Sequence, residues 1–328
     1  MSLLPWRRWR RAPPRVDARQ LDRYAPASLE KYRAEALRFT NWLVHLRVAP
    51  MGADDWDDLA VEYMSSVQLS YDDFGYLLAA LELVFPRYKG HLKWARSVHK
   101  NWGVHTHVKH TTPLCRGPAT LFACWMAARG RVRMGMGLLL QQRRGMRPSE
   151  MLNIRSEDIL LPEEHGLCPR MGYAEIVLGA KAGTKAKRPQ VVIVRGTQEP
   201  ELLVLLRRAK RATPKTHRIV PYSIDTYRSW LKKIAAQLNL ADLDISAHSP
   251  RSGWASEGRA RGIPFTELQE EGRWSAAASL RVYIDLAAAA SISARLKTSG
   301  LAPAIQWVTA RLLDYFPQIA LDAAPSKP

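Results

Sequence analysis

Apolar residues recur at helical spacing in the first third of the chain. Three successive patterns over residues 20–98 each place their apolar side chains on one helix face. The first contains Tyr32, Ala36, Phe39, Leu43 and Leu46, the second contains Leu59, Tyr63 and Val67, and the third contains Phe74, Leu77, Leu78, Leu81 and Val84. Pro86 ends the third pattern, because proline lacks the backbone donor that a helix interior needs. Residues 20–98 are therefore predicted to form a small helical domain.

The pattern differs in the second half of the chain. Residues 117–142 are rich in Ala, Met and Leu and have good helix propensity. Two short β-type runs follow, Tyr173–Gly179 and Gln190–Val194, and they enclose a strongly basic segment. This arrangement predicts a hairpin with a basic tip, and helical character then returns up to the end of the chain. The expected fold class is mainly α with a small β-sheet, that is, α+β.

These patterns divide the chain into five segments. We expect a flexible basic arm over residues 1–19, a helical domain over 20–98, a basic linker over 99–113, a second domain over 114–300, and a C-terminal helix and tail over 301–328. The arm alternates arginines with Trp6 and Trp9, a composition that suits phosphates and grooves. A solvated tail explains the same residues.

The charge balance points to a polyanionic partner. The 328 residues include 49 Lys and Arg against 30 Asp and Glu, a net charge of +19. Each phosphate that such a protein neutralises releases condensed counterions, so nucleic acid is the first candidate partner and an anionic membrane surface the second. No apolar run is long enough to span a bilayer, and the N-terminus lacks the apolar core of a signal peptide. We therefore expect a soluble, intracellular protein.

Cysteine and histidine spacing gives little support for a metal site. Cys115, Cys124 and Cys168 form no close-spaced pair, which argues against a disulfide framework or a zinc knuckle. The segment from His105 to His110 has ligand-like spacing, but no carboxylate or cysteine lies close by to complete the set. A positively charged segment lying along DNA explains these histidines more simply, so no metal is expected.

Four segments carry chemistry when they are taken together. They are Arg144–Leu152 with Arg147 at its centre, the hairpin tip with Lys181, the run from His248 to Arg251, and Gly272–Ser275 with Trp274, which Tyr283 follows nine positions later. The two arginines, the histidine, the lysine and the indole all donate hydrogen bonds, and none of them favours a divalent metal. Such a set suits a phosphodiester in its five-coordinate transition state. A tyrosine hydroxyl would be the natural nucleophile.

In order and spacing these segments resemble the tyrosine recombinase (phage integrase-like) family. That family has an Arg in a Gly-x-Arg-x-x-Glu turn, a Lys on a β-hairpin, His-x-x-Arg, a His or Trp after Gly, and then Tyr. The gap of 23 residues from Arg251 to Trp274 and of nine to Tyr283 fit the family. Each motif alone has a structural explanation: His248 could cap a helix, and Trp274 and Tyr283 could be core residues. The resemblance is sharpest over residues 137–290, and residues 20–110 fit the family's helical core-binding domain only in length and helicity.

The resemblance implies a role for each residue. Arg147 and Arg251 would clamp the scissile phosphate, while His248 would bind it and help proton transfer at the nucleophile. Trp274 would donate its indole N–H and pack against Tyr283, which would form a 3′-phosphotyrosyl link without ATP or any other cofactor. Glu150 would orient the site.

The hairpin and the ends of the chain leave choices open. Lys181 would protonate the leaving 5′-hydroxyl, and Lys185 competes for that role, while Lys187 and Arg188 would contact DNA. The partner implied is double-stranded DNA, bound by a homotetramer when two sites are paired, with no membrane involved. The C-terminal helix would dock on a neighbouring subunit or pack against its own domain. The compartment, nucleoid or nucleus, stays open.

Site-specific strand exchange, as by the integrase of a mobile element, is the leading hypothesis. A type IB topoisomerase-like nicking-closing enzyme would use the same chemistry without pairing two sites. A recombinase-derived DNA-binding protein that no longer cuts is a hypothesis of another class. A metal-dependent nuclease that uses the histidine segment is the most distant.

Overall fold

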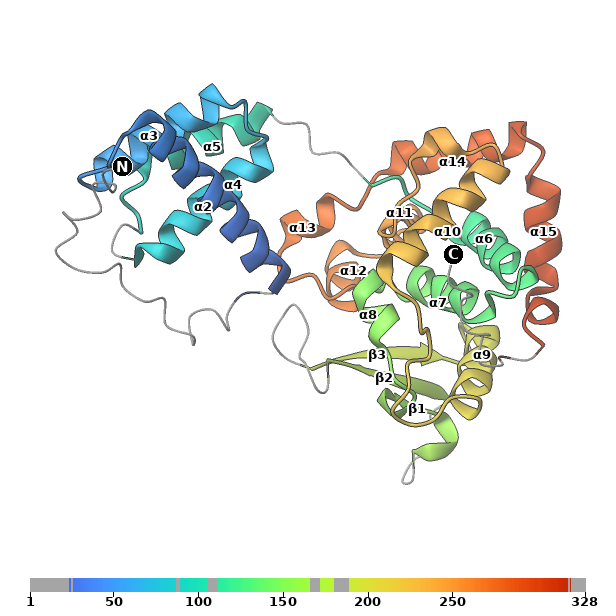
Figure 1. The fold of residues 1–328 in the computed structure, drawn as a ribbon. Helices are drawn as coiled ribbons and strands as arrows, with labels where there is room; N and C mark the ends of the chain where they lie inside the picture. Colours follow the sequence, from blue (N-terminus) through green and yellow to red (C-terminus); the bar gives the residue numbers. More distant parts are fainter. Residues whose placement is uncertain are drawn as a thin grey trace. The chain divides into compact units, whose positions relative to one another are not determined.

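The structure, a computed structural model, describes residues 24, 26–86, 89–105, 111–165, 172–179, 189–317 and 319. Its backbone contacts divide the chain into two compact units, Met1–Val108 and Lys109–Pro328 (Figure 1). Each unit has its own apolar core.

The first unit is a group of helices around an aromatic core. Its helices are α2 (Pro26–Leu46), α3 (Ala53–Ser66), α4 (Tyr71–Val84) and α5 (Lys93–His105). The ring of Phe39 lies 5.1 Å from that of Tyr63 and 5.9 Å from that of Trp56. Both oxygens of the Asp57 carboxylate accept hydrogen bonds, at 2.8 Å each, from the backbone N–H groups of Trp94 and Ala95. These bonds satisfy donors in the first turn of α5 and fix it against α3.

The three patterned segments form α2, α3 and α4, and α5 is an additional helix. Most of the predicted inward positions are buried, but Leu46 and Val67 are each 43% exposed because they lie where α2 and α3 end. Residues 99–105 fall in the segment expected to be a linker and belong to α5. The helix was missed because Ala95 is its only buried residue and its Lys, Arg and His side chains were interpreted as a basic connector.

The second unit contains ten α-helices among its described residues. They are α6 (Arg116–Ala128), α7 (Val132–Arg143), α8 (Pro148–Asn153), α9 (Pro200–Arg211), α10 (Ile224–Gln237), α11 (Ser249–Ala260), α12 (Phe265–Glu271), α13 (Ala277–Arg281), α14 (Leu286–Thr298) and α15 (Ala302–Ala310). The helix propensity of residues 117–142 is expressed as two helices, α6 and α7. They are separated at Gly130, whose φ of +74° only glycine adopts readily.

A three-stranded antiparallel sheet lies at one edge of the second unit. Its order is β1 (Ile159–Leu160), β2 (Tyr173–Leu178) and β3 (Gln190–Arg195), with Ile176 opposite Ile159 and Val192. The hairpin strands agree with the sequence prediction, and β1 was not predicted. The tip of the hairpin, residues 180–188, lies outside the described residues.

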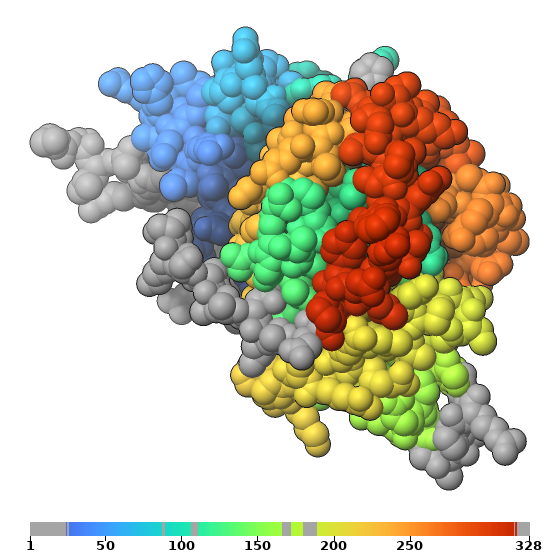
Figure 2. Space-filling model, turned by 90° about the vertical axis from the view of Figure 1, so that its right-hand side faces the viewer, coloured from blue at the N-terminus to red at the C-terminus, as the bar shows by residue number. Residues whose placement is uncertain are grey.

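The C-terminal segment packs against its own unit. Val308 of α15 and the following Leu312 and Phe316 are buried in the same core as Phe122 of α6. Figure 2 shows this red segment lying across the green surface of the second unit. Of the two arrangements left open by the sequence, packing on its own unit is the one the structure has.

The architecture, helical with one small sheet, confirms the α+β class. One described stretch, residues 277–298, is apolar enough by length and composition to cross a membrane. The turn that holds Tyr283 divides it into α13 of 5 residues and α14 of 13 residues. Each helix is shorter than the roughly 20 residues that a spanning helix needs.

Candidate active site

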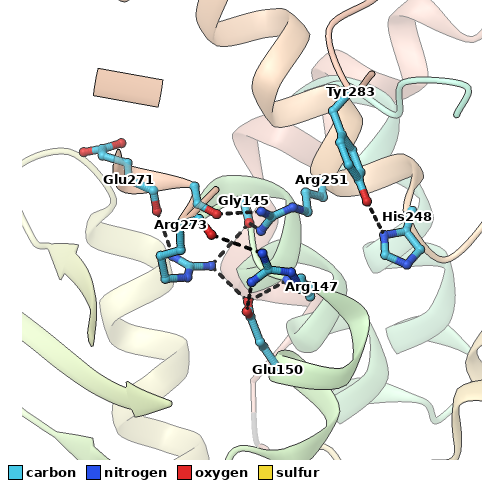
Figure 3. A network of polar contacts seen from close by, with 9 residues as sticks. Gly145, Arg147, Glu150, His248, Arg251, Glu271, Arg273 and Tyr283 are labelled. Carbon is cyan, nitrogen blue, oxygen red and sulfur yellow. Dashed lines mark hydrogen bonds and ion pairs between the residues drawn. The ribbon is translucent and has the colours of Figure 1, made fainter. Parts of the chain in front are cut away.

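The second unit gathers five of the predicted residues at helix ends and turns, and Figure 3 labels four of them, Arg147, His248, Arg251 and Tyr283. Arg147 is the N-cap of α8, His248 is the N-cap of α11, Arg251 lies in the first turn of α11, Trp274 follows α12, and Tyr283 lies in the turn between α13 and α14. Side chains at helix ends and turns can point toward one another even when they come from distant segments of the chain. The five residues span 137 positions of sequence from Arg147 to Tyr283, and the fold makes them neighbours.

Arg251 is the most deeply buried of the group, with no exposed surface. Its Nη1 donates to the carbonyl of Gly145, and its Nη2 donates to the carbonyl of Gly272 at 2.5 Å. The guanidinium carbon lies 3.7 Å from the centre of the Trp274 ring, a cation–π contact. Burial, and then repulsion from Arg147, lower the pKa of Arg251 to about 9. The cation is therefore destabilised and would gain from a nearby anion.

Two glycines make this arrangement possible. Gly145 has a φ of +56°, and a Cβ there would lie 2.4 Å from the Trp254 ring. A Cβ at Gly272 would lie 1.8 Å from the Trp274 ring. The two indoles stack at 6.0 Å with an interplanar angle of 16°. Side chains at either glycine would displace the indoles and the carbonyls that hold Arg251.

Glu150 ties a second arginine into the site. It accepts from the backbone N–H of Arg147 at 2.8 Å, as the N3 glutamate of a capping box does at the start of a helix, and from Arg147 Nη1 at 2.5 Å. It also accepts from Arg273 Nη2 at 3.0 Å. Burial alone would raise the pKa of Glu150, but Arg273 and Arg147 outweigh burial and lower it. Glu150 is thus held as a carboxylate that orients both arginines.

The pair formed by His248 and Tyr283 lies beside the arginines. The Tyr283 hydroxyl lies 3.2 Å from His248 Nδ1, within hydrogen-bond range. The Tyr283 ring centre is 5.4 Å from that of Trp274 and 5.7 Å from the Arg251 guanidinium carbon. His248 occupies the N-cap position, but its side chain makes no capping hydrogen bond. The capping role considered for this histidine is therefore not the one it has here.

Two buried serines of α11 hold the turn that carries Tyr283. Ser252 Oγ lies 2.8 Å and Ser256 Oγ 3.2 Å from the Tyr283 carbonyl oxygen. Ser256 Oγ also accepts from the backbone N–H of Asp285 at 3.0 Å. Both serines are fully buried. The serines therefore attach this turn to the helix that supplies His248 and Arg251.

Cations outnumber carboxylates in this part of the unit. Three guanidiniums, those of Arg147, Arg251 and Arg273, surround the Glu150 carboxylate, so this group carries two positive charges in excess (Figure 3). The Glu271 carboxylate also acts on Arg273, but its ion pairs, at 3.8 and 4.0 Å, are with Arg144 and Arg195 outside the group. Paired buried charges are the rule in proteins, so an excess of this kind indicates a site for an anion with about two negative charges. The arrangement can bind a phosphate and stabilise negative charge that develops on it.

Most of the remaining predicted residues are not described by the structure. Lys181, Lys185, Lys187 and Arg188 lie outside the described residues, as do His107 and His110. His105 is the last residue of α5. Within the described ranges, no three His, Cys, Asp or Glu side chains gather as metal ligands.

Arg273, Ser252 and Ser256 are the site residues that the sequence did not indicate. Arg273 gave one signal, its position next to Trp274. The two serines are spaced by four residues on the helix that also carries Arg251, which would have placed them on one face. What they contact depends on tertiary structure alone.

Comparisons with known proteins show the fold. Two structures of the XerH site-specific recombinase, a post-cleavage complex with palindromic difH substrate and a pre-cleavage complex with difH substrate, match with TM-scores of 0.54 and 0.53. Each is 14% identical and covers 78% of this chain, and the match spans 76% and 75% of their own lengths. The chain has the fold of a site-specific recombinase. The XerA recombinase matches with a TM-score of 0.39 at 12% identity over 85% of this chain and 96% of its own. No family model and no curated protein matches the recombinase-like chain.

Proposed function

We propose that this protein is a site-specific DNA recombinase that cuts and rejoins DNA through a 3′-phosphotyrosyl bond at Tyr283. The observation that carries the proposal is the placement of the Tyr283 hydroxyl. It lies 3.2 Å from a histidine nitrogen and next to a buried cluster of arginines with two uncompensated positive charges. A nucleophile, a proton acceptor and an anion site are three of the parts that the reaction needs.

In the proposed reaction the Tyr283 oxygen attacks the scissile phosphorus. The phenolic proton passes to His248 Nδ1, a bond forms between phosphorus and the tyrosine oxygen, and the bond to the 5′-oxygen breaks. Arg147 and Arg251 hold the non-bridging oxygens, and Trp274 packs against Tyr283 while its indole N–H faces the phosphate. Attack by a 5′-hydroxyl on the phosphotyrosine reverses the step. One ester replaces another in each direction, so no ATP is consumed.

The leaving 5′-oxygen needs a proton. We propose a lysine of the hairpin tip for this, Lys181 or Lys185, with Lys187 and Arg188 contacting the DNA backbone. The net charge of +19 and the XerH complexes with difH substrates support double-stranded DNA as the partner. We further propose that four copies assemble when two sites are paired, that the protein works inside the cell on DNA, and that a mobile element uses it for integration.

The test is covalent capture. The protein is incubated in EDTA with nicked duplexes that contain its binding sequence, selected beforehand from a random library, and a protein–DNA adduct is sought on a denaturing gel. Tyr283→Phe should abolish the adduct because it lacks the nucleophilic oxygen. Tyr315→Phe is the matched control, because Tyr315 is a partly buried tyrosine of the same unit that lies in Leu312–Tyr315, remote from these residues in sequence.

The outcomes separate the hypotheses. An adduct with wild type and Tyr315→Phe but not with Tyr283→Phe supports the proposal. An adduct with Tyr283→Phe, or one that needs a divalent metal, contradicts it. Specific binding without an adduct favours a DNA-binding protein that no longer cuts, and relaxation of a plasmid without the site favours a nicking-closing enzyme.

A further inference from the structure

Arg273 has a backbone conformation that its residue type disfavours. Its φ is +59°, in the left-handed region where a Cβ is strained and glycine is the usual residue. Its side chain is nevertheless only 6% exposed. Strain of this kind persists where the surrounding contacts hold the residue in place, and it concentrates at functional sites. The contacts of Arg273 therefore indicate which part of the site depends on its strained backbone.

Those contacts lead to the proposed phosphate clamp from two directions. Arg273 Nη2 donates to Glu150 at 3.0 Å and to the Gly145 carbonyl at 3.3 Å, and its Nη1 donates to the Glu271 carbonyl at 2.8 Å. Its own carbonyl accepts from Arg147 Nη2 at 3.1 Å. Glu150 and Gly145 are also the acceptors for Arg147 and Arg251 respectively. Figure 3 shows Arg273 with Glu271 on one side and Gly145, Arg147 and Glu150 on the other.

Arg273 also changes the charge of the site. Without it, Arg147 and Arg251 would face the carboxylate of Glu150 with one net positive charge. With it, the site carries two. A DNA phosphodiester has one negative charge, and the five-coordinate transition state has two. The added charge therefore matches the transition state better than the ground state, which is where it accelerates a reaction.

We propose that Arg273 is a positioning residue for this reaction. It shares the Glu150 carboxylate with Arg147, so that the carboxylate neutralises Arg147 only in part. It also fixes both clamp arginines and raises the net charge of the site to match that of the transition state. The inference rests on the proposed function. Arg273 itself acts through Arg147, Glu150 and Gly145, without contact to the phosphate.

The test separates rate from affinity. We measure the single-turnover rate of adduct formation at saturating nicked duplex, and the Kd of the same duplex with Tyr283→Phe in the background so that no covalent product forms. Arg273→Gln should lower the rate by about 10- to 100-fold, the range for groups that orient ligands. It should leave Kd within about threefold, since transition-state contacts act on rate and not on ground-state affinity. Arg273→Lys keeps the charge and should recover part of the rate.

Two further variants separate positioning from backbone strain. Arg273→Gly removes the side chain at a φ that glycine adopts freely, so the rate should fall while the protein stays folded. Asn239→Gly makes the same backbone change at an exposed residue of the second unit with a φ of +56°, and should leave the rate unchanged. A wild-type rate in Arg273→Gly, or equal changes in rate and Kd in Arg273→Gln, would overturn the inference.

A readout independent of cleavage keeps the inference testable if the protein proves not to cut. The Glu150 carboxyl is titrated by carbon NMR in wild type and in Arg273→Gly, with Glu150→Gln used to assign the signal. Loss of Arg273 should raise the pKa of Glu150, because Arg273 is the strongest of the charges that lower it. An unchanged pKa contradicts the positioning role. Absence of any adduct with wild type contradicts only the proposed reaction.

Discussion

The serines that hold Tyr283 give the sharpest mutational prediction. The Tyr283 carbonyl has two donors in range, the hydroxyls of Ser252 and Ser256. Ser252→Ala leaves the Tyr283 carbonyl one donor, and also removes the hydroxyl 3.0 Å from the Thr111 carbonyl; it should cost about 0.5–1.5 kcal/mol, the net value of a hydrogen bond. Ser256→Ala also removes the acceptor of the Asp285 N–H and should cost about 1–3 kcal/mol more. These extra losses belong to the single variants and cancel in a double-mutant cycle. The double variant leaves the carbonyl with neither, which adds a desolvation penalty of about 1–3 kcal/mol. The two losses should therefore be coupled by roughly 0.5–3 kcal/mol, as expected for residues that share a partner.

The assay is a double-mutant cycle in denaturant-induced unfolding, combined with the rate of adduct formation. Alanine favours helix over serine by a few tenths of a kcal/mol at each position, and this term cancels in the cycle. The rate should fall most in the double variant, because the turn that aims the hydroxyl is then released from α11. Strict additivity of the two unfolding changes, or a double variant that cleaves at the wild-type rate, would refute the idea that the serines share and position the Tyr283 carbonyl.

Three further predictions concern the anion site. Gly145→Ala should lower the free energy of unfolding by about 2–5 kcal/mol, because a side chain there is strained at a left-handed φ and overpacks against Trp254; unfolding in urea measures this. The same variant should form no adduct. Glu150→Gln should cost about 3–5 kcal/mol at neutral pH, because it leaves buried arginines without their carboxylate. The pKa of Glu150 is lowered in the fold, so its contribution is present above its ordinary value of 4.5 and is lost as pH falls below it; the unfolding free energy of Glu150→Gln should depend less on pH in that acid range.

Much of the fold follows from residue periodicity. The inward residues of α4 and the two long strands of the sheet were predictable, because a helix face repeats every three to four residues and a strand face every two. The break between α6 and α7 was not. One glycine in a helix costs only about 1 kcal/mol, so Gly130 alone does not reveal whether the helix continues. Packing of the whole unit decides whether the helix continues there.

The site residues likewise fall into those that the sequence predicted and those that it did not. His248, Arg251, Trp274 and Tyr283 could be proposed because their types and gaps form a recognisable set. Arg273 looks in sequence like any exposed cation beside a tryptophan. Its burial, its left-handed backbone and its bond to Glu150 arise from segments more than 120 residues apart, and a single sequence carries no trace of that distance.

The manner in which each arginine is held explains how the site can keep uncompensated charge. Arg251 is oriented by the carbonyls of Gly145 and Gly272, which fix a guanidinium without cancelling its charge. Arg147 and Arg273 share one carboxylate, so each is neutralised only in part. A guanidinium has five N–H donors, and Arg251 spends two on these carbonyls, while its Nε has no partner among the described residues. The three guanidiniums are thus held in place before an anion binds, and the folding of the unit stabilises this arrangement of like charges. A preformed cage of this kind requires little reorganisation when charge develops on a phosphate, which is the condition under which electrostatic catalysis is strongest.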